Sequence, residues 1–104
     1  RDVNYDPLKA DLLVIMGGAT GVYQKDKYPF IKQELSILEQ RLEKDLPTLG
    51  ICFGAQLMAG ALGAPVYKGS KGVERFWQDI EITPEGMKTP LRHLDQSKTR
   101  MMQY

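Results

Sequence analysis

The only cysteine of the chain, Cys52, stands between two glycines in the run Gly-Ile-Cys-Phe-Gly at residues 50–54. Glycines on both sides of a cysteine suit a tight turn between a strand and a helix, because side chains there would collide with the flanking elements. The N–H groups that open the following helix stabilise negative charge beside them. The spacing therefore indicates a cysteine nucleophile, with the N–H of Phe53 available to an oxyanion. The alternative is a buried cysteine packed in a strand, a common setting for an isolated cysteine.

The segments that flank Cys52 have the patterns of a strand and a helix. Residues 46–51 form a short apolar run that contains a proline near its start, which predicts a buried strand. Residues 55–62 are mostly small and apolar and are followed by Gly63, which is typical of a helix and its C-terminal end. Cys52 is therefore expected at the junction of the two elements.

A strand and a helix are also predicted before this junction. The apolar run at residues 11–16 predicts a strand that leads into the diglycine at residues 17–18. Pro29 suits the first turn of a helix, which is expected to end within residues 44–47. The order strand, helix, strand, helix favours right-handed parallel crossovers and an α/β fold. The helix would face the sheet with an apolar stripe formed by Ile31, Leu35, Leu38 and Leu42.

Downstream of Gly63 the patterns are weaker. Residues 66–67 predict the start of a short strand, and residues 76–83 predict another. The tail after Pro84 has little periodicity, which leaves loop, helix and disorder open. The apolar members of the strand at 76–83 are Trp77, Ile80 and Ile82.

From about residue 10 to residue 77 the sequence resembles the class I, or triad-type, glutamine amidotransferases, and among them the amidotransferase part of GMP synthase. The resemblance rests on Gly-Ile-Cys-Phe-Gly-Ala-Gln at residues 50–56, on its continuation through residues 57–66, and on the upstream strand that ends in Gly17-Gly18. It implies a flavodoxin-like fold, with a mainly parallel sheet flanked by helices.

The resemblance also implies a chemistry and a set of site residues. Cys52 would attack the side-chain amide of glutamine, form a γ-glutamyl thioester and release ammonia to a synthetase domain or subunit. Gly18 and Phe53 would donate their N–H groups to the oxyanion, and Gly17 and Gln56 would contact the substrate. The family's reaction at this site requires glutamine and no cofactor.

Two positions depart from the pattern of the family. The proline that usually follows the diglycine is Ala19 here, which removes a restraint on the loop that aims the Gly18 N–H. The usual Glu-x-Gly-Trp is Glu-Arg-Phe-Trp at residues 74–77, so that Phe76 replaces a glycine.

The family also needs a histidine base and a glutamate, in a His-x-Glu pair near the C-terminus of a longer domain. The only histidine is His93, in Leu-Arg-His-Leu-Asp, and no apolar strand precedes it. We expect His93 to be solvated in a loop or short helix. Residues 1–104 are therefore expected to be part of one class I glutamine amidotransferase domain, lacking the first strand and the C-terminal His-x-Glu region, and to be inactive in isolation.

Two rival functions stay open. One is a cysteine hydrolase of γ-glutamyl compounds that has no ammonia-using partner. The other is a non-catalytic, amidotransferase-like module that binds a partner. A histidine base within reach of Cys52 would separate both enzymes from the module.

Composition excludes several other classes. The 104 residues carry 14 Lys and Arg against 13 Asp and Glu, a net charge of +1, so no electrostatic footprint for nucleic acid or a membrane surface is present. One cysteine and one histidine do not make a metal-ligand set. The diglycine lacks the spacing of a phosphate-binding loop. A single cysteine and the lack of a long apolar run lead us to expect a cytoplasmic protein.

Overall fold

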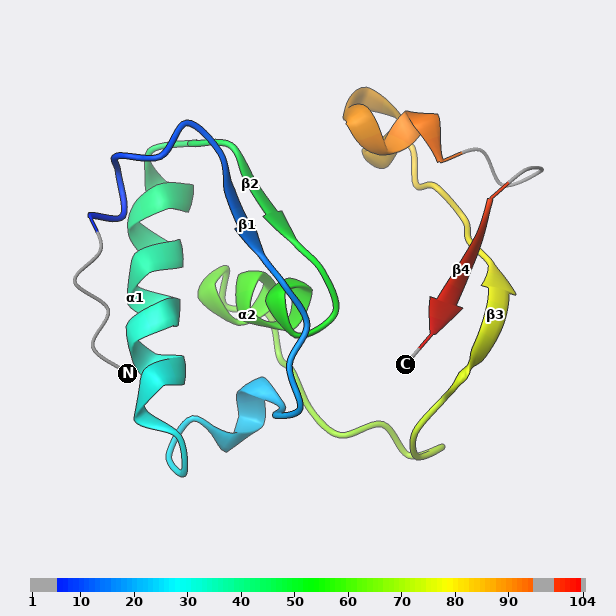
Figure 1. The fold of residues 1–104 in the computed structure, drawn as a ribbon, viewed down its shortest axis with the longest axis horizontal. Coiled ribbons are helices and arrows are strands. Elements are labelled where there is room, and N and C mark those ends of the chain that lie inside the picture. The colour runs from blue at the N-terminus through cyan, green and yellow to red at the C-terminus, as the bar shows by residue number, and fades with distance from the viewer. Residues whose placement is uncertain (1–5, 95–98, 104) are drawn as a thin grey trace. The chain divides into compact units, whose positions relative to one another are not determined.

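The computed structural model describes residues 6–94 and 99–103 of the chain. The chain divides into two compact units, residues 1–68 and residues 69–104, each with its own two-stranded sheet (Figure 1). The elements of the first unit are β1 (Leu13–Ile15), the 3-10 helix η1 (Val22–Gln24), α1 (Pro29–Glu43), β2 (Thr48–Gly50) and α2 (Phe53–Ala61).

The first unit has the predicted α/β order. Strands β1 and β2 pair in parallel, with Leu13 opposite Thr48 and Ile15 opposite Gly50. The connection between them runs through α1, and α2 leaves the end of β2 (Figure 1). Because parallel strands end at the same edge of a sheet, the loop after β1 and the turn after β2 lie together. The predicted α/β fold is confirmed.

Helix α1 forms where the apolar stripe predicted it. Pro29 occupies its first position, where a missing N–H costs nothing, and Tyr28 before it is extended. The helix ends at Glu43, Lys44 caps it, and Asp45 follows with a φ of 52°. A left-handed residue just after a helix reverses the chain, and here it directs the chain into β2.

The core of the first unit lies on one face of the sheet. Leu13 and Ile15 of β1 pack against this core, whereas Val14 and Leu49 point to the other face and are exposed. Helices α1 and α2 pack against each other, and α2 also contacts both strands. The buried core residues are Val22, Ile31, Leu38, Phe53 and Leu57.

A buried arginine joins the loop before β1 to the start of β2. The side chain of Arg41 in α1 is 0% exposed. Its Nη1 donates to the carbonyl oxygens of Pro7 and Ala10 at 2.8 and 2.9 Å. Its Nη2 donates to the Pro47 carbonyl at 2.8 Å, and its Nε to the Thr48 hydroxyl at 3.3 Å. We call this group the Arg41 clasp.

The second unit contains an antiparallel pair of strands. Trp77 lies opposite Met102, and Asp79 lies opposite Arg100, whose Nε is 3.5 Å from the Asp79 carboxylate. Arg100 Nη2 also donates to the Trp77 carbonyl at 3.1 Å. The elements are β3 (Phe76–Asp79), the 3-10 helices η2 (Gly86–Lys88) and η3 (Pro90–His93), and β4 (Arg100–Gln103).

Three predictions for the second half of the chain need correction. Residues 66–67 form no strand; Tyr67 is 77% exposed. The strand predicted at 76–83 ends at Asp79, and the chain turns at Thr83, whose hydroxyl accepts from the N–H of Gly86 at 3.1 Å. The tail after Pro84, for which loop, helix and disorder were open, contains strand β4, which pairs antiparallel with β3.

Candidate active site

Cys52 lies at a strand-to-helix turn in a strained conformation. It follows β2 and directly precedes α2, with a φ of 57° and a ψ of −112°. In the described part of the chain, only Asp45 and Cys52 are non-glycine residues with a positive φ. Holding a side chain in such a region costs on the order of 1–3 kcal/mol. The predicted turn is therefore confirmed, and the exposure of Cys52 is contrary to the alternative of a buried structural cysteine.

The two flanking glycines make this turn sterically accessible. A Cβ on Gly50 would lie 2.6 Å from the carbonyl carbon of Gly54, and a Cβ on Gly54 would overlap the carbonyl oxygen of Ile15. Both obstacles are backbone atoms, which cannot rotate away. Strand β1, strand β2 and the first turn of α2 thus approach one another more closely than any side chain would permit.

The backbone around Cys52 continues from the sheet into the helix without a break. The N–H of Ile51 donates to the Ile15 carbonyl at 2.9 Å, which extends the pairing of the two strands to the residue before the cysteine. The Cys52 carbonyl then accepts from the N–H groups of Ala55 and Gln56, at 3.0 and 3.2 Å. Phe53 is the first residue of α2, so its N–H has no acceptor within the helix.

The diglycine loop after β1 lies directly against the Cys52 turn. A Cβ on Gly17 would be 3.4 Å from the Cβ of Cys52 and 3.7 Å from its Sγ. A Cβ on Gly18 would be 3.5 Å from Cδ1 of the Phe53 ring. Two consecutive loop residues therefore face two consecutive residues of the turn, so the structure brings four of the predicted site residues together.

Gln56, the fifth predicted site residue, lies in the first turn of α2, and its N–H donates to the Cys52 carbonyl at 3.2 Å. Its Oε1 is buried, and no hydrogen-bond partner is found for it among the described residues. A buried acceptor without a donor costs roughly 1–3 kcal/mol.

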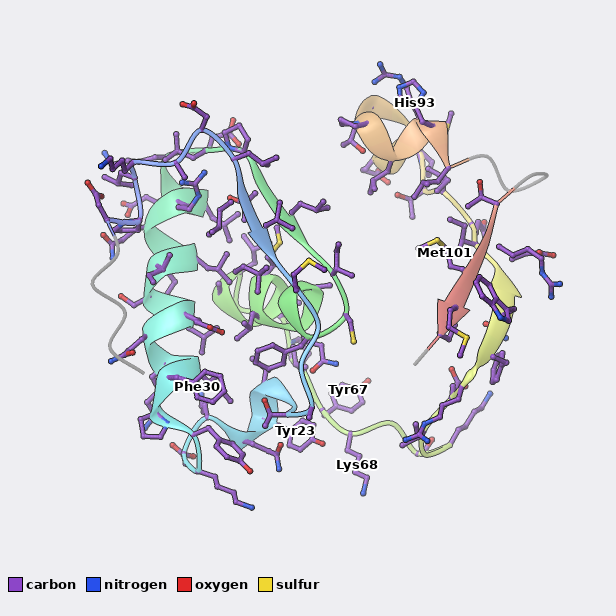
Figure 2. All side chains as sticks on the ribbon, in the orientation of Figure 1. Tyr23, Phe30, Tyr67, Lys68, His93 and Met101 are labelled. Carbon is purple, nitrogen blue, oxygen red and sulfur yellow. The ribbon has the colours of Figure 1, made fainter. Side chains whose placement is uncertain are left out.

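His93 belongs to the second unit. It ends η3 and is exposed (Figure 2), which confirms the expectation of a solvated residue in a loop or short helix.

Glu34 lines a cavity beside the diglycine loop, but it was not predicted as a site residue from the sequence. A cavity of about 590 Å³ in the first unit is lined by the diglycine loop, by Phe53 and by three residues of α1. These three, Phe30, Glu34 and Ile37, follow helical spacing, which could have placed them on one face. Phe30 projects from the start of the helix (Figure 2). Glu34 brings an acidic group to the cavity, and its helical spacing from Phe30 and Ile37 is the signal that could have found it.

Among the described residues, no cluster of three His, Cys, Asp or Glu side chains could hold a metal ion. No helix in that part of the chain is long and apolar enough to cross a membrane.

Comparison with known proteins gives one consistent family. The family described as "Glutamine amidotransferase class-I" matches residues 2–102. A "Glutamine amidotransferase-like protein chry6" of Gibberella zeae is 33% identical over 85 residues, which are 80% of this chain and 35% of that protein. A "GMP synthase [glutamine-hydrolyzing]" of Anaplasma marginale is 32% identical over 74 residues, 70% of this chain and 14% of that protein.

A solved structure agrees with these matches. The crystal structure of a glutamine amidotransferase from Thermotoga maritima covers 97% of this chain with a TM-score of 0.69 and 33% identity. The chain in turn spans 42% of that protein, and about a third or less of the two relatives. By family match, sequence relatives and fold, the chain belongs to the class I glutamine amidotransferases.

Proposed function

We propose that Cys52 is the nucleophile of a glutamine amidotransferase that hydrolyses glutamine and passes the ammonia to a synthetase domain or subunit. The observation that carries this proposal is an exposed cysteine, in a strained conformation, next to a diglycine loop and the N-terminus of a helix. Strained residues of this kind concentrate at active sites. We expect the protein to act in the cytoplasm, where a lone cysteine stays reduced.

In the proposed reaction the Cys52 sulfur attacks the side-chain amide carbon of glutamine, and the carbonyl oxygen becomes an oxyanion. The N–H groups of Gly18 and Phe53 donate to that oxygen. The carbon–nitrogen bond then breaks, and the nitrogen takes up a proton and leaves as ammonia, so that a γ-glutamyl thioester remains on Cys52. Water hydrolyses the thioester to glutamate and restores the thiol.

Gly17 and Gln56 fit the roles of substrate contacts. Because Gly17 has no side chain, the space next to the Cys52 sulfur stays open on that side. The buried Oε1 of Gln56 accepts an N–H of the bound glutamine, which removes the penalty of an unsatisfied acceptor.

Proton transfer in this reaction needs a base. We propose that it comes from a His-x-Glu pair outside residues 1–104, and that these residues are part of one amidotransferase domain whose first strand and C-terminal region lie beyond them. Two observations support this: the only histidine is exposed in a short helix, and the solved relative is more than twice as long as this chain.

Ammonia release tests the proposal. The full-length protein should hydrolyse glutamine, and Cys52→Ala should reduce the rate by several powers of ten, because nucleophile and base act as a unit. Residues 1–104 alone should be alkylated slowly at Cys52 by a thiol-directed glutamine analogue, without measurable turnover. Ser36→Ala, an exposed change in α1, is the control and should keep the activity of the full-length protein.

Each rival function has its own result in this assay. Rapid turnover by residues 1–104 would mean that a base lies within them and that the proposed division of the site is wrong. An inactive full-length protein that lacks a His-x-Glu pair would support a non-catalytic module. Activity on γ-glutamyl compounds without any ammonia-using domain or subunit would support the hydrolase.

A further inference from the structure

The side chain of Phe53 is buried beside the diglycine loop, a position that the backbone role of this residue does not explain. Phe53 as a residue is only 5% exposed, although it directly follows an exposed cysteine. It belongs to the buried core of the first unit. At the same time it faces the diglycine loop, because a Cβ built on Gly18 would be 3.5, 3.7 and 3.9 Å from its Cδ1, Cγ and Cβ. The ring therefore connects the core to the loop.

The diglycine loop is exposed and is made of residues that restrict the backbone little. Gly17, Gly18 and Ala19 are all exposed, and the two glycines allow more backbone conformations than any other residue. A proline at residue 19 would fix φ near −65°, whereas Ala19 has no ring that restricts this angle. The position of the loop therefore depends on its neighbours, and the side chain nearest to a Cβ built on Gly18 is that of Phe53.

On these grounds we propose that Phe53 is a positioning residue for the oxyanion site. Its ring supports Gly18 and keeps the Gly18 N–H directed at the same oxygen as the Phe53 N–H. The inference rests on the proposed function, which assigns those two N–H groups to the oxyanion. Phe53 would then determine both oxyanion donors. It supplies one N–H from its own backbone, and its ring positions the other, the N–H of Gly18. The ring replaces the restraint that proline would otherwise supply at residue 19.

The first variant is Phe53→Leu, which keeps an apolar core residue and the backbone N–H but removes the flat ring. Complete loss of one oxyanion donor costs about 100- to 1,000-fold in kcat. A donor that is displaced but present should cost less, and we expect kcat for glutamine to fall about 10-fold while KM changes less than about twofold.

Rescue by proline separates positioning from general core damage. In the described part of the chain positive φ at non-glycine residues is confined to Asp45 and Cys52, so Ala19 has a negative φ, the sign that a proline ring needs. Ala19→Pro added to Phe53→Leu should recover at least half of the lost activity on a logarithmic scale. A purely structural defect in the core would not respond to a proline in the loop.

Leu57→Val is the control. Leu57 is fully buried in the same helix and the same core as Phe53, and it does not line the cavity, so the substitution perturbs the core without touching the diglycine loop. We expect it to change kcat by less than about twofold.

Hydrogen exchange keeps the inference testable if glutamine turns out not to be the substrate. In the full-length protein, Phe53→Leu should speed amide exchange at Gly17 and Gly18 at least 10-fold relative to wild type and to Leu57→Val, and Ala19→Pro, which itself removes the N–H of residue 19, should slow it again. Unchanged exchange in Phe53→Leu, or a kcat loss that Ala19→Pro leaves in place, would overturn the positioning role. An inactive wild-type protein in which exchange still responds would refute the proposed function and leave the loop restraint standing.

Discussion

Arg41→Met should remove a large part of the folding stability of this chain. The variant loses three hydrogen bonds from a charged donor to backbone carbonyls at 2.8–2.9 Å. Hydrogen bonds that involve a charged group contribute about 1.5–3 kcal/mol each, which gives roughly 5–9 kcal/mol before any offset. The offset is the desolvation of a guanidinium that is 0% exposed, which costs several kcal/mol and disappears with the charge. We therefore expect a net loss of about 3 kcal/mol.

A loss of that size is easily measured. For a domain of 60–100 residues, about 1 kcal/mol shifts Tm by roughly 4–8 °C, so Tm should fall by about 12–24 °C. Far-UV circular dichroism during thermal and urea unfolding gives both Tm and the free energy of unfolding. Arg41→Lys should fall between wild type and Arg41→Met, because a single ammonium cannot reproduce the planar fork of donors.

The control for Arg41→Met is Arg92→Met. Arg92 is exposed in η3 and donates to one carbonyl, that of Thr89, at 3.3 Å. Removal of such a surface group should change stability by no more than about 0.5 kcal/mol. If Arg41→Met unfolds within about 1 kcal/mol of this control, the carbonyls of the Arg41 clasp are satisfied by water and the reasoning above is wrong.

Two further predictions concern packing in the first unit and are checked by urea unfolding. Gly54→Ala should cost about 1–3 kcal/mol, since its Cβ overlaps the fixed carbonyl oxygen of Ile15, whereas Gly60→Ala in the same helix meets only ordinary contacts and should gain about 0.5–1 kcal/mol. Equal effects of the two alanines would contradict the steric argument. Leu38→Ala should cost about 2–5 kcal/mol, because Leu38 is fully buried, and a loss below 1 kcal/mol would mean that the core of α1 is loosely packed.

The Cys52 turn and helix α1 could be predicted because each depends on local rules. Glycines at residues 50 and 54 are required by a close backbone approach, and that requirement shows in the sequence as a fixed spacing around the cysteine. The stripe of α1 repeats with the period of a helix. The contact of Gly17 with Cys52 then follows from the parallel pairing of the strands before them.

The Arg41 clasp and strand β4 could not be predicted, because each depends on distant partners. An arginine in a helical pattern is usually solvated, and its burial here requires carbonyls more than 30 residues earlier in the chain. Strand β4, Arg-Met-Met-Gln, has no β-branched or aromatic residue, so its intrinsic propensity for a strand is low. The strand is stabilised by its pairing with β3. The cavity residue Glu34 was missed for the same reason, since its position matters only beside the loop after β1.

The backbone of Cys52 also has an evolutionary consequence. At a φ of 57° and a ψ of −112°, a glycine would avoid most of the strain, and a single nucleotide change converts a cysteine codon to a glycine codon. Selection for stability alone would therefore favour glycine here, by an amount on the order of 1–3 kcal/mol in a domain whose total stability is only about 5–15 kcal/mol. Proteins in which the sulfur is needed for catalysis should therefore keep the cysteine. Relatives that have lost the reaction should acquire glycine at this turn while they retain the surrounding fold.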